Sequence, residues 1–287
     1  MLSLRPLTLL GGLLVSAVLA QAQAPIPAKP TFDSSDPQVY GKQLMTYADR
    51  YDSGWKDEVS SGSMRLFDAG GDSVLRTYTR LALERPAGNK YIIRFKTPAE
   101  IKGVGALTHE NPNSSDDNWL YLPATRRVRR ISGANNTASF QGTEFTYEDL
   151  SAIDPVEYEW RFLAEETLKT ADGDVPTYKI QGIPTYANTG YTRLVIWIHR
   201  EHWRRERVDY YDKASRHLKT LTASGWHRVH GRFWRNKRLE MKNLQTKKRT
   251  VLDVPKLFLD LARYKSRSGK PRKNLSESLF TSRALAK

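Results

Sequence analysis

Apolar and polar side chains alternate with a period of two residues along most of the chain, and this pattern constrains the fold most. It is clearest over residues 157–165, where Tyr158, Trp160 and Phe162 alternate with charged residues. A period of two places alternate side chains on one face of a β-strand. Short turns such as residues 69–72 separate the segments, and such turns join antiparallel neighbours. The sequence therefore predicts a mainly β chain with few helices, forming a single curled antiparallel sheet that does not close into a full barrel.

Two longer helices are predicted, one near each end of the folded domain, and a short helix is predicted to start near Thr146. The first covers residues 37–51: Asp36 or Ser35 can cap it, and Pro37 suits the first helical position, where an N–H has no partner within the helix. Its apolar positions form a partial stripe that suits packing across a sheet: Val39, Leu44, Met45 and Ala48. The second helix is expected over residues 275–285, with Asn274 as its N-cap.

Residues 1–22 have the pattern of a secretion signal peptide. Arg5 precedes an apolar run over residues 7–19, and Ala20-Gln21-Ala22 suits cleavage. The run is short for a transmembrane anchor. Residues 23–35 contain three prolines and are expected to form an N-terminal extension before one folded domain over residues 36–287.

The chain contains no cysteine. This excludes disulfides, thiolate metal sites and a lipid-modified cysteine after the signal peptide. We therefore expect an exported periplasmic protein that is not itself a lipoprotein.

Basic residues dominate the second half of the sequence. The formal net charge is +15, and residues 193–249, here called the basic segment, hold 17 basic and 5 acidic residues, a net +12. Exported proteins do not normally meet nucleic acid, so an anionic membrane surface or an acidic partner is the expected target. A broad outward patch is predicted from these residues: Arg204, Arg205, Arg207, Arg228, Arg232, Arg235, Lys237 and Arg238.

Residues 118–150 combine a strand, an arginine cluster and a long polar loop. The strand ends at Pro123, which has no N–H to donate. The cluster consists of Arg126, Arg127, Arg129 and Arg130. Arginine forks can bind an anion, but charged residues also protect an edge strand from aggregation, and both interpretations stay open. The loop over residues 133–142 is long enough to be a lid, so we expect it to be mobile and to become ordered with ligand.

These residues carry a family resemblance. The segments WLYLP (119–123), RRVRRI (126–131) and SFQGTEFTYEDL (139–150) resemble the outer-membrane lipoprotein-sorting (LolA-like) family, specifically its larger periplasmic branch. The resemblance extends from about Val39 to Leu285 and includes residues 279–283. It implies an unclosed antiparallel β-barrel with a helical lid over an apolar cavity, and a domain over residues 36–287 that binds lipid or lipoprotein.

The resemblance also suggests where a ligand would lie. A curled sheet of this size has more apolar surface than one short helix can cover. Five aromatic residues would then line the cavity: Trp119, Tyr121, Tyr158, Trp160 and Phe162. In a closed sandwich the same side chains would be ordinary core. The arginine cluster 126–130 would contact the headgroup.

Motifs for catalysis, nucleotide binding and metal binding are not found. His199 and His202, and likewise His227 and His230, are three residues apart, but strand geometry does not favour a metal site. Two acidic pairs, Asp116/Asp117 and Glu148/Asp149, are expected to be solvated. We expect no cofactor, no metal and no enzymatic activity.

The preferred hypothesis is a periplasmic carrier that binds acyl chains of a lipid or lipoprotein and takes part in outer-membrane sorting. The alternative is a non-catalytic interaction subunit that docks on a membrane transporter or envelope complex through its basic face. Nucleic acid is not an expected partner of either.

Overall fold

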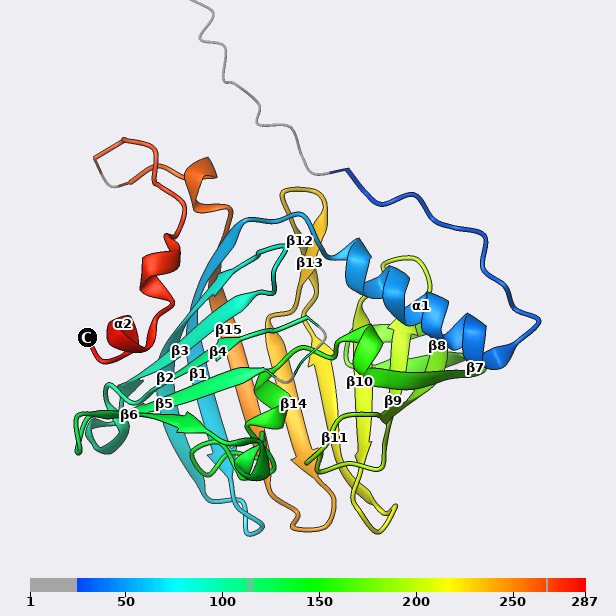
Figure 1. Cartoon of the computed structure of the whole chain (residues 1–287), viewed down its shortest axis with the longest axis horizontal. Helices are drawn as coiled ribbons and strands as arrows, with labels where there is room; N and C mark the ends of the chain where they lie inside the picture. Colours follow the sequence, from blue (N-terminus) through cyan, green and yellow to red (C-terminus); the bar gives the residue numbers. More distant parts are fainter. Residues whose placement is uncertain (1–24, 113, 115, 267) are drawn as a thin grey trace, which may run out of the picture.

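A large antiparallel sheet is the central feature of the computed structural model, which describes residues 25–287 except 113, 115 and 267 (Figure 1). The predicted signal peptide lies outside the described residues. The first half of the sheet contains β1 (Asp57–Phe67), β2 (Ser73–Leu83), β3 (Lys90–Thr97), β4 (Gly105–His109), β5 (Asp117–Leu122) and β6 (Arg127–Ile131). The second half contains β7 (Tyr158–Thr170), β8 (Gly173–Pro184), β9 (Arg193–His199), β10 (Arg205–Tyr211), β11 (His217–Ser224), β14 (Arg238–Asn243) and β15 (Arg249–Leu259).

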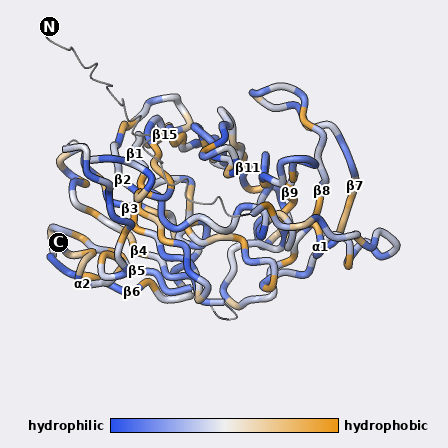
Figure 2. The backbone as a smooth tube through the Cα atoms, turned by 90° about the horizontal axis from the view of Figure 1, so that it is seen from above, coloured by the Kyte–Doolittle hydropathy of each residue, from blue (hydrophilic) through white to orange (hydrophobic). Residues whose placement is uncertain are grey.

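The strand order shows two meanders joined in the middle: β6-β5-β4-β3-β2-β1-β15-β14-β11-β10-β9-β8-β7. The joint is the antiparallel pairing of β1 with β15. The edge strands β6 and β7 do not pair with each other, so the sheet is curled but open, as the sequence predicted. Figure 2 shows this arc, with α1 near the β7 end.

The strand register gives the sheet one continuous apolar face. A row of partners crosses six strands on this face: Phe162, Ile180, Ile196, Val208, Leu221 and Met241. We call it the inner face, because the buried residues of helix α1 (Pro37–Tyr51) belong to the same hydrophobic core. Burying both sheet face and helix stripe is the main source of stability expected for such an arrangement.

The first predicted helix is confirmed with the same bounds. Asp36 caps α1 by accepting hydrogen bonds from the backbone N–H of Gln38 at 2.6 Å and Val39 at 3.3 Å. The helix lies very close to β7: a Cβ atom on Gly41 would be 2.6 Å from the backbone of Arg161. The described part of the N-terminal extension contacts α1, where Tyr47 donates a hydrogen bond to the carbonyl of Pro27.

Residues 227–234 could be interpreted from their sequence as one strand, but they form a separate hairpin. Its strands are β12 (His227–Val229) and β13 (Phe233–Arg235). The chain reverses because His230 and Gly231 both adopt positive φ values, 51° and 69°. In Figure 1 this hairpin stands beside the C-terminal end of α1, and Arg235 binds Asp52 there at 2.7 Å.

The predicted helix over residues 275–285 is also corrected. The segment forms a 3-10 turn (Glu277–Leu279) and a short helix, α2 (Ser282–Leu285). Asn274 is not a cap, because its side chain accepts the N–H of Ala262. Phe280 and Leu285 are fully buried against the outer face of the sheet.

Short 3-10 turns occupy the connections: Ala99–Ile101, Gly133–Asn135, Glu148–Leu150, Pro155–Glu157 and Leu261–Arg263. Within the described part of the chain, no helix combines the length and the apolar character that crossing a membrane requires.

Candidate ligand-binding cavity

A cavity of about 560 Å³ lies on the inner face of the sheet. It is bordered on one side by α1 and on the other by residues 133–153, which we call the lid segment. This volume falls within the usual range of small-molecule sites. Much of its wall is apolar: Met45, Ala48, Met64, Ile93, Ala106, Phe140, Phe145, Leu150, Val208, Leu221, Leu239, Leu252 and Leu257.

The lid segment is anchored over the first half of the sheet by Phe140. This side chain is fully buried, and its ring stacks on Phe95 of β3 with the centroids 5.8 Å apart. Tyr147 packs edge-on against Phe140 at 5.7 Å. Large aromatic side chains buried in this way contribute strongly to the stability of a contact.

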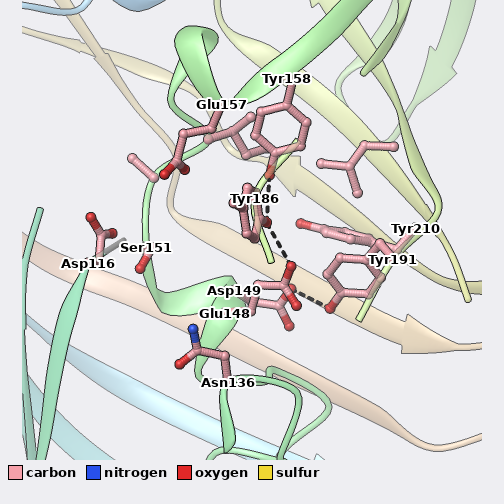
Figure 3. Close-up of a pocket in the computed structure, with 13 residues that line it drawn as sticks. Asp116, Asn136, Glu148, Asp149, Ser151, Glu157, Tyr158, Tyr186, Tyr191 and Tyr210 are labelled. Carbon is pink, nitrogen blue, oxygen red and sulfur yellow. Dashed lines mark hydrogen bonds between the residues drawn. The ribbon is translucent and has the colours of Figure 1, made fainter. Parts of the chain in front are cut away.

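Two acidic residues anchor the lid segment over the second half of the sheet (Figure 3). Asp149 forms an ion pair with Lys219 of β11 at 2.5 Å, and both side chains are only 2% exposed. Tyr191 also donates to Asp149, at 2.7 Å. Glu148 accepts hydrogen bonds from the Tyr186 hydroxyl at 2.7 Å and from the Gly190 N–H at 2.8 Å.

The expectation that Glu148 and Asp149 are solvated is therefore wrong. The alternation of side chains along β11 could have identified the partner of Asp149 from the sequence. Lys219 shares its face with Leu221 and Ala223, so it points inward and needs a buried counter-charge.

Charged residues form a second part of the cavity wall. Glu58 accepts from Arg80 at 2.8 Å and from Arg235 at 2.9 Å. Burial favours its neutral form, but the two guanidinium groups hold the pKa of Glu58 below its usual value. Glu84 has no such pair of partners, and burial raises its pKa to about 7.

The five aromatic residues predicted to line the cavity are placed on two faces. Trp160 and Phe162 pack in the core beneath α1, and Tyr158 borders a small polar recess of about 60 Å³ beside Tyr186. Trp119 and Tyr121 lie on the outer face, in the cluster that holds Phe280 and Leu285. None of the five borders the 560 Å³ cavity.

The placement of Trp119 and Tyr121 corrects the sequence prediction. Leu120 pairs with Ala106 on the inner face, so the residues on either side of Leu120 must face outward. Because alternate residues of a strand face opposite sides, an error of one residue assigns every side chain of the strand to the wrong face.

The arginine cluster lies on the open edge of the sheet. Arg127, Arg129 and Arg130 belong to the edge strand β6 and are exposed, and Arg126 sits in the turn before it with φ 51°. Arg130 forms an ion pair with Asp117. None of the four borders the cavity, and their place suits protection of an unpaired edge.

Many cations of the basic segment are paired with carboxylates. Arg207 binds Asp209 within the segment, whereas Lys219, Arg235 and Arg238 bind acids outside it: Asp149, Glu58 and Asp253. The prediction of one broad outward patch considered only the five acidic residues within the basic segment. It did not include the carboxylates from other parts of the chain that pair with these cations. A different stretch, residues 265–273, exposes Lys265, Lys270, Arg272 and Lys273.

His199 and His202 stack on each other with ring centroids 4.2 Å apart. His199 accepts the backbone N–H groups of Glu201 and His202, at 3.1 and 3.3 Å. Among the described residues, no three His, Cys, Asp or Glu side chains are grouped so that they could hold a metal ion.

A family model described as an uncharacterized protein matches residues 87–287. A crystal structure of a proposed outer membrane lipoprotein-sorting protein domain from Vibrio parahaemolyticus is 32% identical, with a TM-score of 0.77, over 86% of this chain and 98% of that chain.

Two further structures share the fold. A DUF1329 family protein from Desulfovibrio piger is 28% identical, with a TM-score of 0.76, over 88% of this chain and all of that chain (100%). A LolA superfamily protein from Nitrosomonas europaea is 17% identical, with a TM-score of 0.62, over 84% and 97% of the two chains. No curated protein sequence matches the chain.

Proposed function

Because this chain belongs to the outer-membrane lipoprotein-sorting (LolA-like) family, we propose that it is a periplasmic carrier. It would bind the acyl chains of a lipid or lipoprotein in the inner-face cavity and take part in outer-membrane sorting. The observation that supports this most is the cavity itself, about 560 Å³ with a largely apolar wall bordered by α1 and the lid segment. Each methylene group moved from water into such a wall contributes about 0.8 kcal/mol.

The proposed role is non-catalytic. Several carboxylates and guanidinium groups that border the cavity bind one another, as Glu58 does with Arg80 and Arg235. Pairs of this kind satisfy their own hydrogen-bonding groups beside the apolar part of the wall.

The lid segment is the part proposed to move when ligand exchanges. Its first section, residues 133–139, has no fully buried side chain among those described, whereas Phe140 and Asp149 anchor the residues that follow. In the proposed opening of the lid segment, one of these two anchors keeps its contacts with the sheet and the other is released.

A direct test is to purify the mature protein without detergent, extract it with solvent and identify what is bound by mass spectrometry. We expect lipid or lipoprotein acyl chains at a fixed ratio to protein, and uptake of a fluorescent acyl probe after delipidation. Absence of bound lipid together with absence of probe uptake would contradict the proposal.

We further propose that the carrier touches an anionic membrane through residues 265–273. The four described cations of this loop are exposed, and no carboxylate is paired with them among the described residues. Each charge near an anionic surface contributes about 1 kcal/mol, so four together would give reversible docking. The alternative role, a subunit docking on a transporter, would use the same exposed charges on an acidic protein.

A further inference from the structure

Arg204 is held rigidly at one side of the cavity. Its Nε donates a hydrogen bond to Oε1 of Glu206 at 2.6 Å, and Trp226 Nε1 donates to Oε2 of the same carboxylate at 2.9 Å. The guanidinium carbon lies 4.8 Å from the ring centroid of Trp226 and 4.3 Å from that of Trp234. The Arg204 and Glu206 side chains are 11% and 1% exposed. One carboxylate and two indole rings therefore fix the plane of this guanidinium.

The outer edge of the guanidinium is left without a protein partner. Within the described chain, nothing accepts a hydrogen bond from either Nη atom of Arg204, and four of its five N–H donors remain available. Trp234 Nε1 is a second donor nearby that is buried and has no partner. Arg204, Trp226 and Trp234 all border the cavity. Buried donors without partners are rare, so the free N–H of Trp234 beside the open edge of Arg204 points to a ligand.

The surrounding charges favour a negative group. Arg205 also borders the cavity, and Arg228 stacks on Trp234 at 5.0 Å. Burial lowers the pKa of His202, and the charges of Arg204 and Arg228 lower it further against a small opposing effect of Glu201.

Two nearby carboxylates already have partners: Glu206 is bound as described, and Asp172 accepts the N–H of Gly225 at 2.8 Å. Burial raises the pKa of Asp49, a third carboxyl at the cavity, against an opposing effect of the Arg205 charge. An anion entering from the cavity would therefore meet donors whose other sides are already satisfied.

We propose that this side of the cavity binds the anionic headgroup of the acyl ligand, a carboxylate or a phosphate, on the Nη edge of Arg204. Carboxylates and phosphates can each present two oxygens to this edge and accept two parallel hydrogen bonds. The inference rests on the proposed carrier function and adds the headgroup class to it. It also gives the headgroup role to a residue inside the cavity instead of the edge arginines 126–130.

The test compares three probes with the same fluorescent chain at pH 8: a fatty acid, an alkyl phosphate and the neutral fatty alcohol. Wild-type protein is compared with the double variant Arg204→Gln/Glu206→Gln, because replacing Arg204 alone would leave Glu206 buried and unpaired. The matched control is Arg129→Gln on the exposed edge strand. Circular dichroism confirms that each variant is folded.

Wild-type protein and the control should bind at least one anionic probe about tenfold or more tightly than the alcohol. The double variant should lose this preference while its affinity for the alcohol stays within about twofold, a small change on the scale of a lost hydrogen bond. The better anionic probe identifies carboxylate or phosphate as the headgroup.

Three other results would overturn the inference in distinguishable ways. Equal binding of all three probes to wild-type protein would remove the headgroup site and leave the carrier function. A preference retained in the double variant would show that Arg204 is a structural clamp only. Failure of every probe to bind would count against the carrier function itself.

Discussion

Lys219 and Asp149 show how much one residue pair contributes to closing the cavity. Lys219 also donates to the carbonyl of Glu144 at 3.0 Å and lies 5.3 Å from the ring centroids of Tyr191 and Tyr210. The Lys219 nitrogen and both carboxylate oxygens of Asp149 have hydrogen-bond partners, which is the condition under which a buried ion pair is tolerated. The pair connects the lid segment to the middle of the second meander.

Removing one member of this pair should be costly. Lys219→Met leaves Asp149 buried without its counter-charge, and we expect the free energy of unfolding to fall by about 3–5 kcal/mol. Urea denaturation measures this loss. The control is Arg130→Met, which breaks the more exposed pair with Asp117 and should cost at most about 1 kcal/mol. Equal losses in the two variants would mean that Lys219 does not hold the lid segment.

Glu84 gives the protein a pH dependence of predictable sign. Burial raises its pKa from 4.5 to about 7, and Asp52 and Asp260 add to the shift while the Gly54 N–H and Arg235 oppose it. A pKa that is higher in the folded state means that folding favours the protonated form. This contribution to stability is fully present below pH 4.5 and is lost as pH rises through 7.

Glu84→Gln removes that titration. The melting temperature of the variant minus that of the wild type should therefore be more positive at pH 8 than at pH 5. Scanning calorimetry at both pH values measures the difference. Glu157, whose pKa burial and neighbouring carboxylates also raise to about 7, is present in both proteins and cancels. A difference that does not change with pH would show that Glu84 ionises normally.

At the scale of elements, the lid segment should respond to ligand. In the empty protein, the amides of residues 133–142 should exchange with deuterium faster than those of β9. Several turns within residues 133–142 are held by single backbone hydrogen bonds at exposed positions. Adding an acyl probe should slow exchange in this range and leave β9, whose residues are mostly buried, unchanged. Exchange that is equally slow with and without probe would remove the gating role.

Elements with a strong local pattern could be predicted from the sequence. The alternation over residues 157–165 and the cap, proline and apolar stripe of residues 36–51 depend on neighbours along the chain, and β7 and α1 occur where expected. The pairing of β1 with β15 was not predicted, because it joins segments from opposite ends of the domain. The short hairpin β12–β13 was missed because strand alternation continues through its turn.

The site was harder to predict than the fold. Leu239, Leu252 and Leu257 reach the cavity only because β14 and β15 pair beside β1. The aromatic residues chosen from sequence were the largest side chains, but Trp160 fills the core and Trp119 faces outward. Arg204 could not be singled out among many arginines without the two tryptophans that hold it.

At the scale of the whole molecule, the charged loop should decide membrane contact. Replacing Lys265, Lys270, Arg272 and Lys273 with glutamine should abolish flotation with anionic vesicles at low salt. The control removes four exposed lysines elsewhere and should still float: Lys213, Lys242, Lys247 and Lys248. Raising the salt should release the wild type, because the screening length is about 8 Å at physiological ionic strength. Equal loss in both variants would point to net charge instead of a docking loop, and no flotation of the wild type would favour an acidic protein partner.

Filling the cavity tests most directly whether it holds the acyl chain. Ala223 of β11 is 7% exposed and borders the cavity, whereas its neighbour Thr222 is exposed on the outer face. Titration of delipidated protein with a fluorescent acyl probe compares Ala223→Trp with Thr222→Trp, after circular dichroism confirms that both are folded. We expect Thr222→Trp to bind like the wild type and Ala223→Trp to bind about tenfold more weakly or worse, a loss equivalent to about two methylene groups. Equal affinity of the two variants would contradict an acyl-binding cavity on the inner face of the sheet.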